Sequence, residues 1–296
     1  MDGILVVNKP QGWTSHDVVG RIRRLTRQKR VGHAGTLDPM ATGVLLVCLG
    51  RATRVAEYLM DSDKTYRAVV RLGVETDTFD ADGRVVATHV VDVDESGLRV
   101  ALAHFVGAID QVPPMYSALK RDGKPLYQLA RQGIQVERKP RHITIYDIAL
   151  RTWQPPDVTI DVRCSSGTYI RSLAHDIGAM LGCGAHLIAL TRLASGAFTL
   201  EEAVTLEDLT APEDLSGHLH PLDAALQDLP ILTLDADQAR RIVLGQAIPV
   251  LEVEAPADSP LRRAHDASGA LLAIMVFDAA AQVWRPKKVL ADGTQA

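Results

Sequence analysis

The sequence has few cysteines and no long apolar run, and each shortage excludes a class of protein. Its 296 residues include only three cysteines, Cys48, Cys164 and Cys183, and no CxxC pair. This isolated, odd-numbered set predicts neither a disulfide framework nor a zinc site, and it suits a reducing compartment. No segment reaches the roughly 18 uncharged apolar residues of a membrane helix, and the amino terminus lacks the pattern of a secretory leader. We therefore expect a cytoplasmic protein that does not span a membrane.

Net positive charge is lacking as well, although basic residues gather in two places. The formal net charge is −4, which by itself argues against a nucleic-acid partner, because phosphate binding needs clustered Lys and Arg. Residues 21–30 nevertheless hold six basic residues and no acid, and a second basic block spans residues 120–141. A solvated surface and a phosphate-binding face both explain such a block. The candidate RNA-binding residues of the two blocks are Arg21, Arg23, Arg24, Arg27, Lys29, Arg30, Lys120, Arg121, Lys124 and Arg131.

The apolar pattern predicts more strands than helices. The predicted strands cover residues 4–7, 43–50, 65–72, 84–91, 142–150 and 157–163, and a strand pair or bent strand covers 186–200. The predicted helices are one that begins after a cap at Thr14 or Ser15, those at 52–60, 98–107 and 126–133, and one capped by Thr168. Because the strands mostly follow one another, we expect an α+β fold with a mixed, largely antiparallel central sheet flanked by helices.

The pattern changes near residue 230. Residues 205–229 predict a helical connector interrupted by proline. Short alternating stretches follow, ILTL, ARRIVLGQAIPV, ALLAIMVF and WRPKKVL, which are typical of a small β-rich module. We therefore expect two domains, a larger one over residues 1–229 that includes the connector and a smaller one over 230–296.

One carboxylate, Asp38, lies in a turn punctuated by glycine just before a buried strand. Gly35 and Gly43 flank it, and Pro39 follows it directly. Glycine permits positive φ angles and close backbone approach, so the turn can be tight enough to present the carboxylate at the mouth of a cleft. The same residues also form ordinary turns. Both interpretations, a structural turn and a reactive carboxylate, stay open at this point.

Three other residues have a functional and a structural interpretation. Tyr66 begins a strand and either fills the core or stacks on a flat substrate beside Asp38. Arg171 falls in the first turn of a helix, where the helix dipole disfavours a cation. An ion pair with Asp38 would offset this and would hold the carboxylate ionised, as a nucleophile requires at neutral pH. His33 is suited to hydrogen bonds with backbone or phosphate.

Five blocks occur in order along the chain: GHAGTLDPMATGVLLVCLGRATR, SDKTYRAVVRLGVETDTFDADG, PPMYSALKRDGKPLYQLARQG, CSSGTYIRSLAHDIG and CGAHLIALTRLASGAF. From about residue 3 to residue 200 the chain resembles the TruB family of tRNA pseudouridine synthases. The segment after about residue 230 resembles a shortened PUA-type RNA-binding domain. The resemblance implies that the substrate is uridine 55 in the T-loop of tRNA, which is flipped out and isomerised. It also implies a monomer that binds the tRNA T-arm, with no cofactor and no metal.

The resemblance assigns roles to individual positions. The family's catalytic aspartate falls on Asp38, its active-site tyrosine on Tyr66, and the arginine that pairs with the aspartate on Arg171. The histidine that helps to hold the everted loop falls on His33. The positions that line the pocket fall on Lys9, Tyr169 and Leu190.

Other functions remain as alternatives. A noncatalytic RNA-binding or tRNA-folding protein would use Asp38 only as a turn residue, and a guide-RNA-dependent homologue would share the motifs. Phosphotransfer through an aspartyl phosphate needs a cluster of acids that binds Mg²⁺. No other carboxylate lies within 15 residues of Asp38 in the sequence, which argues against phosphotransfer.

Overall fold

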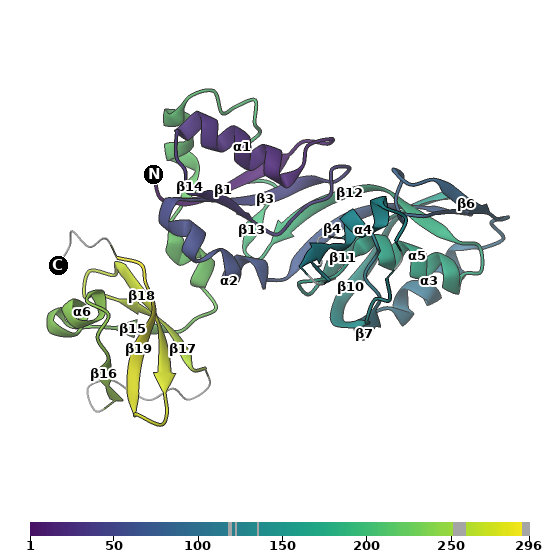
Figure 1. Cartoon of the computed structure of the whole chain (residues 1–296). Coiled ribbons are helices and arrows are strands. Elements are labelled where there is room, and N and C mark those ends of the chain that lie inside the picture. The colour runs from purple at the N-terminus through teal and green to yellow at the C-terminus, as the bar shows by residue number, and fades with distance from the viewer. Residues whose placement is uncertain (118–119, 122, 135, 251–258, 292–296) are drawn as a thin grey trace.

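A ten-stranded sheet forms the larger part of the molecule in the computed structural model (Figure 1), which describes residues 1–117, 120–121, 123–134, 136–250 and 259–291. Its main path runs β14-β1-β3-β12-β4-β11-β10-β7, with β2 beside β3 and β13 beside β12. The strands are β1 (Gly3–Lys9), β2 (Val31–Ala34), β3 (Thr42–Leu49), β4 (Lys64–Leu72), β7 (Gly107–Gln111), β10 (Arg141–Gln154), β11 (Asp157–Cys164), β12 (Ala185–Ser195), β13 (Phe198–Thr199) and β14 (Leu219–His220).

The pairing confirms the expected mixed, largely antiparallel sheet. Every ladder of this sheet among the described residues is antiparallel except the one between β3 and β12. That parallel ladder joins only two residue pairs, Thr42 with Thr191 and Gly43 with Arg192. The neighbouring ladder between β1 and β3 joins seven pairs. The two halves of the sheet therefore meet along a short parallel seam, formed by these two residue pairs.

Helices cover both faces of this sheet. They are α1 (Ser15–Thr26), α2 (Ala56–Met60), α3 (Glu95–His104), α4 (Leu126–Arg131) and α5 (Ile170–Met180). The start of α1 follows the predicted capping pattern, because Thr14 Oγ1 accepts a hydrogen bond from the Asp17 amide and the Asp17 carboxylate accepts one from the Thr14 amide. Val18 and Ile22 of α1 pack into the core on one face of the sheet, while α2 packs against the other face.

A second, five-stranded sheet has its own core. It follows the order β15-β17-β18-β19-β16 and packs beside helix α6 around the fully buried Trp284. The elements are β15 (Ile231–Thr233), α6 (Ala236–Val243), β16 (Ile248–Pro249), β17 (Leu261–His265), β18 (Leu271–Asp278) and β19 (Val283–Val289). Its contacts with the rest of the chain include hydrogen bonds from Arg51 to the Leu290 carbonyl and from Lys288 to the Arg54 carbonyl. Arg263 and His265 of β17 also bind the Asp223 carboxylate of the connector.

Several local predictions were wrong. The stretch that begins ARRIV was expected to be extended, but residues 236–243 form α6, because Asp235 caps the helix with hydrogen bonds to two of its first amides. Thr168 does not cap α5. Its hydroxyl donates to the Ser165 carbonyl instead, and Tyr169 takes the cap position without a side-chain bond.

The other differences concern short elements. The helix expected at 52–60 is split into a 3₁₀ helix, η1 (Gly50–Arg54), and α2. The strand expected at 84–91 is shorter, β6 (Val85–Thr88), and pairs with β5 (Val74–Thr76). The connector contains two 3₁₀ helices, η2 (Pro212–His218) and η3 (Leu222–Leu226), and no α-helix among its residues. The predictions placed no strand at β2 or β7.

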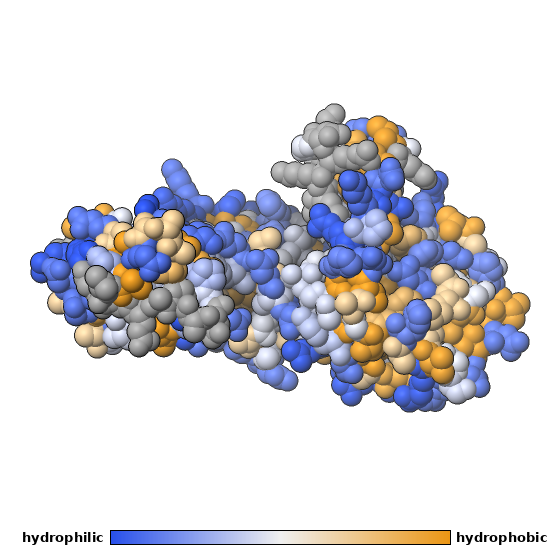
Figure 2. All heavy atoms as spheres, turned by 90° about the horizontal axis from the view of Figure 1, so that it is seen from below, coloured by the Kyte–Doolittle hydropathy of each residue, from blue (hydrophilic) through white to orange (hydrophobic). Residues whose placement is uncertain are grey.

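Figure 2 shows apolar residues gathered on the part of the larger body that lies away from the second sheet. The exposed large apolar residues of this part include Val85 and Val86 in β6 and Val100 in α3. No helix in the described ranges is both long enough and apolar enough to cross a membrane.

The close approach of the strands at the seam predicts that substitution by alanine lowers stability at one glycine, Gly43, much more than at another, Gly32. Gly43 has a φ of +95°, and a Cβ there would lie 2.3 Å from the Arg192 carbonyl oxygen. A Cβ on Gly32, in β2, would meet no atom within 4 Å. We therefore expect Gly43→Ala to lower the free energy of unfolding by about 2 to 4 kcal/mol, from backbone strain and overpacking. Gly32→Ala is the matched control, and urea unfolding of both variants measures the difference. Equal stability of the two variants would contradict the close approach at the seam.

Candidate active site

The turn between β2 and β3 holds Asp38 in place from both sides. The Ser15 hydroxyl accepts a hydrogen bond from the Leu37 amide at 2.9 Å, and the Gly12 amide donates to the Pro39 carbonyl at 2.8 Å. The Ala41 amide donates to the Asp38 carbonyl at 3.0 Å, which closes the turn. Asp38 thus forms the turn that the first interpretation required, and its carboxylate remains available for chemistry.

Lys9 binds the backbone of this turn and of the loop beside it. Its side chain is fully buried, and its ammonium donates to the carbonyls of Pro10, Trp13 and Pro39 at 2.9, 2.6 and 3.3 Å. Burial lowers the pKa of Lys9 to about 8. The resemblance placed Lys9 on the pocket wall, whereas these contacts direct its ammonium to the backbone that carries Asp38.

Arg171 forms the ion pair with Asp38 that the sequence suggested. Its Nε lies 3.0 Å from Asp38 Oδ2 and its Nη2 lies 3.3 Å from Oδ1, so the pair is bidentate. The same guanidinium donates to the Tyr116 carbonyl at 2.7 Å. Only 6% of the Arg171 side chain is exposed, against 37% for Asp38. The arginine is therefore buried behind a carboxylate that is open on one side.

A second carboxylate, Asp80, also binds Arg171, and the sequence reasoning missed it. Asp80 Oδ2 lies 3.1 Å from Arg171 Nη1, and both side chains are 6% exposed. The Thr78 hydroxyl donates to Asp80 at 2.5 Å, and Phe79 between them has a φ of +64°. The acid-rich turn ETDTFDADG was visible in the sequence, but no local pattern indicated that it would fold back onto α5.

The electrostatics of Asp38 combine opposing effects. Burial raises the pKa of Asp38, Arg171 lowers it, and the negative charge of Asp80 raises it. The result is a pKa above its usual value of 3.8. The Asp38 carboxylate is therefore less hydrated than a surface carboxylate, and Arg171 favours its ionised form.

Tyr66 and Arg192 lie opposite each other on the neighbouring strands β4 and β12. Tyr66 in β4 lies directly opposite Arg192 in β12, and Arg192 hydrogen-bonds its side chain. Arg192 is 1% exposed and donates to the carbonyls of Val44 at 2.6 Å and Gly35 at 3.0 Å. Burial raises the pKa of Tyr66, so its hydroxyl is neutral at physiological pH. The guanidinium of Arg192 thus links the Tyr66 strand to both ends of the Asp38 turn.

The other expected pocket residues lie on or beside three elements, β2, α5 and β12. The His33 ring packs edge-on against His16 at 5.9 Å, burial lowers its pKa, and its buried Nδ1 has no hydrogen-bond partner within the described chain. Tyr169 caps α5, and its backbone amide and carbonyl both bond to the Gln111 side chain. Leu190 in β12 is 7% exposed.

The first basic block lies on and after α1. Arg23 donates to the Val31 carbonyl and Arg21 to the Leu209 carbonyl, so these two guanidiniums also make internal contacts. Arg24, Arg27, Lys29 and Arg30 are exposed. For the second block the structure describes the backbone of β8 (Lys120–Arg121), β9 (Lys124–Pro125) and α4. The side chains of Lys120, Arg121, Lys124 and Arg131 lie outside the described part.

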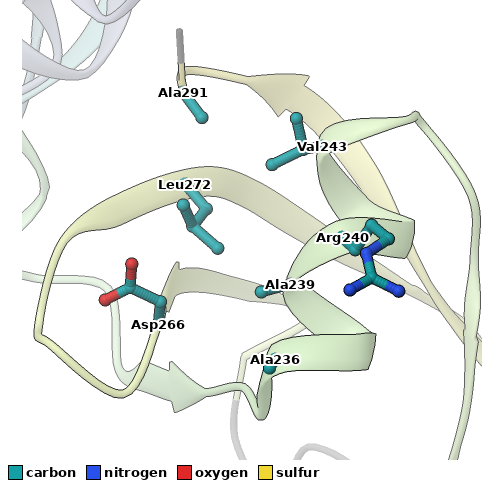
Figure 3. Close-up of a pocket in the computed structure, with 7 residues that line it drawn as sticks. All are labelled: Ala236, Ala239, Arg240, Val243, Asp266, Leu272 and Ala291. Atoms are coloured by element: carbon teal, nitrogen blue, oxygen red, sulfur yellow. The ribbon is translucent and has the colours of Figure 1, made fainter. Parts of the chain in front are cut away.

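A separate hollow of about 200 Å³ lies in the second sheet's half of the molecule, beside α6 (Figure 3). It is lined by Ala236, Ala239, Arg240, Val243, Asp266, Leu272 and Ala291. None of these residues belongs to the cluster around Asp38. Within the described ranges no group of three or more His, Cys, Asp or Glu side chains is arranged to hold a metal ion.

Comparison with known families identifies the fold as that of a pseudouridylate synthase. Residues 23–170 match the N-terminal domain of the TruB family pseudouridylate synthases, and residues 171–227 match the tRNA pseudouridylate synthase B C-terminal domain. Together these matches cover more than half of the chain. The chain belongs to the TruB family.

Individual relatives agree with this family. A tRNA pseudouridine synthase B from Syntrophotalea carbinolica is 55% identical over 252 residues, which are 84% of this chain and 82% of the relative. One from Burkholderia mallei is 48% identical over 298 residues, covering 99% of this chain and 98% of the relative.

Solved structures share the fold over nearly the whole chain. A chain of an H/ACA RNP bound to a substrate RNA containing 2'-deoxyuridine is 26% identical, with a TM-score of 0.75, and the match covers 98% of this chain and 85% of that one. A chain of a Cbf5-Nop10-Gar1 complex is 28% identical, with the same TM-score and the same coverage.

Proposed function

We propose that this protein converts uridine 55 in the T-loop of tRNA into pseudouridine, with Asp38 as the catalytic group. The coarser assignment, pseudouridine formation in tRNA, rests on the TruB family and on relatives at 48% to 55% identity. The observation that carries the proposal is the Asp38 carboxylate, open on one side and paired on the other with the buried Arg171. This arrangement supplies an ionised, poorly hydrated carboxylate without a metal or a redox group.

The reaction is an isomerisation. The bond from N1 of uracil to C1′ of the ribose breaks, the base turns, and C5 bonds to C1′. The proton on C5 is lost, and N1 gains one. Asp38 can attack C1′, attack C6 of the ring, or promote loss of the C2′ proton to give a glycal. Each route needs the ionised carboxylate that Arg171 favours.

The walls of the site have a second task. Detached uracil must stay in place until C5 reaches C1′, because escape would leave an abasic site. The Tyr66 ring offers a flat surface for the base, and Leu190 with Tyr169 offers apolar walls. His33 stands beside the turn, where it can contact the everted RNA loop.

The target uridine must leave its stack, which costs a few kcal/mol of stacking. Contacts to phosphates offset this loss and fix the register of the RNA. The exposed Arg24, Arg27, Lys29 and Arg30 support such a role for the first basic block. The second block belongs to the same proposal. The T-loop is recognised by its shape more than by duplex sequence.

The proposal includes two domains. Residues 1–229 would carry the catalytic site and the connector, and residues 230–296 would form an RNA-binding domain. The separate core around Trp284 and the separate five-stranded sheet support a division near residue 230.

The similarity values favour a stand-alone tRNA enzyme over a guide-dependent one. Identity is 48% to 55% with the proteins named tRNA pseudouridine synthase B, but 26% to 28% with chains from the H/ACA and Cbf5 complexes. The structure also argues against phosphotransfer. Folding brings Asp80 near Asp38, but Arg171 binds both carboxylates, so they do not form a free acidic pair for Mg²⁺.

A tritium-release assay tests the function. The purified protein is incubated, without added metal, with an unmodified tRNA transcript tritiated at C5 of its uridines. We expect release of a single equivalent of tritium, and none from a transcript that carries cytidine at position 55. The absence of release by a correctly folded protein would reject the activity. Release from the cytidine transcript would reject only the position.

A further inference from the structure

A hollow lies beside the Asp38 turn, and of its lining residues the proposed function uses Arg24 alone, as a phosphate contact. It has a volume of about 330 Å³. We call it the α1 hollow. It is lined by Gly12, Trp13, His16, Asp17, Gly20 and Arg24. All six come from α1 or from the loop that leads into it, so one short stretch of the chain builds the whole hollow.

The α1 hollow is connected directly to the active site. The Gly12 amide donates to the carbonyl of Pro39, the residue after Asp38, and the Trp13 carbonyl accepts from the buried Lys9 ammonium. On the other side, His16 meets the ring of His33 edge-on at 5.9 Å. The loop that carries the hollow and the turn that carries Asp38 are therefore fixed to each other.

The floor of the hollow contains a glycine that the fold does not require. Gly20 lies in the middle of α1, where glycine is less favourable than alanine. A Cβ at this position would meet only the Arg24 guanidinium, at 3.9 Å. No packing within the described chain therefore explains the missing side chain. Its absence leaves backbone accessible to a flat group from outside the protein.

The side chains around this floor suit one nucleotide. Trp13 is half-buried and packs against the core, so its indole is held while part of it stays accessible. Arg24 is exposed and can pair with a phosphate. The one acid, Asp17, is already engaged, because its carboxylate accepts hydrogen bonds from the Thr14 amide at 2.9 Å and the Thr14 hydroxyl at 2.6 Å.

We propose that the α1 hollow binds a nucleotide that neighbours the target uridine in the same RNA strand. Its base stacks on the Trp13 indole above Gly20, and its phosphate pairs with Arg24. His16 and His33 lie between this base and the target uridine and separate the two. This inference rests on the proposed function, because it needs an RNA strand that enters the Asp38 site.

Tryptophan fluorescence tests the stacking directly. The full-length Asp38→Asn protein, which holds RNA without turnover, is titrated with an unmodified tRNA transcript. Base stacking on Trp13 should quench its emission, while Trp284 is fully buried and should not respond. The third tryptophan, Trp153 in β10, contributes equally with and without Trp13, so the comparison below isolates the Trp13 signal. We expect most of the quenching to vanish in Asp38→Asn with Trp13→Phe, since phenylalanine keeps a stacking surface but removes the reporter. Undiminished quenching in that variant would overturn the proposal.

A filling substitution tests the space. Gly20→Leu should keep α1 folded but block the hollow, and we expect it to weaken RNA binding about tenfold, the usual scale for losing one stacked base. Gly20→Ala, which adds one carbon, is the matched control and should bind nearly as well as wild type. In the active protein, Gly20→Leu should raise KM and leave kcat almost unchanged.

The outcomes separate this inference from the proposed function. Wild-type tRNA affinity in Gly20→Leu, together with normal tritium release, would reject the α1 hollow and leave the function intact. RNA binding that quenches Trp13, without any tritium release by the wild-type protein, would reject the proposed function and leave the α1 hollow intact. Failure of both the wild-type and the Asp38→Asn proteins to bind tRNA would reject both.

Discussion

Asp38→Asn should abolish pseudouridine formation while the protein still binds tRNA. Asparagine has nearly the same size as aspartate, and its amide oxygen can still accept a hydrogen bond from Arg171. It cannot act as a nucleophile or as a base, so every route available to Asp38 is closed. We expect the rate to fall by at least about 10⁴-fold, the scale seen when the central group of a catalytic set is removed. Single-turnover tritium release measures the rate, and filter binding measures the affinity.

The neighbouring carboxylate provides the control for this result. Asp80→Asn also replaces a carboxylate that binds the Arg171 guanidinium, but Asp80 is buried and faces Arg171. We expect it to reduce the rate far less than Asp38→Asn does, because it affects the orientation of Arg171 and not the reacting group. Substantial activity in Asp38→Asn, or equal losses in the two variants, would contradict the assignment of Asp38 as the catalytic group.

Arg171→Met should impair both activity and stability. Methionine fills much of the same volume but leaves two carboxylates and the Tyr116 carbonyl without their shared donor. Removing one member of a buried ion pair typically costs about 3 to 5 kcal/mol. We expect a loss of that size in urea unfolding near neutral pH. The rate should fall as well, because Arg171 would no longer oppose the rise in the Asp38 pKa that burial causes.

The pH dependence of this variant has a defined sign. The proposed reaction needs an ionised Asp38, whose pKa is already above 3.8, so we expect the wild-type rate to fall on acidification at a pH above that value. Loss of Arg171 raises the pKa of Asp38 further and moves this acidic limb to higher pH. A raised carboxyl pKa lowers stability as pH rises through it. The stability deficit of Arg171→Met should therefore shrink as the pH approaches 4.

Arg171→Lys distinguishes charge from geometry. Lysine keeps the positive charge but cannot donate in a bidentate fork to Asp38 while also reaching Asp80 and Tyr116. We expect it to recover part of the stability and little of the rate. Full recovery of the rate by lysine would show that only the charge matters, which would contradict the positioning role given to the guanidinium.

The site was predictable where chemistry is encoded in local residue types. The Asp38 turn followed from its glycines and proline, and the unfavourable position of Arg171 at a helix start indicated a carboxylate partner. Asp80 could not be found this way, because it lies 91 residues from Arg171 and reaches it only after the turn at Phe79 folds back. Arg192 was missed for a similar reason: its role depends on the register that places it opposite Tyr66.

The fold shows the same division between local and tertiary information. The start of α1 was predictable because both partners of its cap lie within three residues of each other. The largely antiparallel sheet followed from the succession of strands. The helix α6 was missed although its apolar residues recur at helical spacing and Asp235 caps it, because its last residues were interpreted together with the extended stretch that follows. The strand β2 was missed because its four residues, VGHA, resemble a glycine turn until β3 pairs with them.

The short parallel seam places the candidate active site at the boundary between the two halves of the sheet. Asp38 stands on one half of the sheet, whereas Tyr66 and Arg171 stand on the other, and the ladder between β3 and β12 joins two residue pairs among the described residues. Side-chain bonds also connect the two halves. Arg171 forms an ion pair with Asp38, and Arg192 donates hydrogen bonds to the carbonyls of Val44 and Gly35. Any flexing of the two halves would therefore widen or narrow the gap between Asp38 and Tyr66, which the proposed reaction must bridge. An RNA strand lying over both halves would set that gap, and the enzyme would reach its reactive geometry only with its substrate in place.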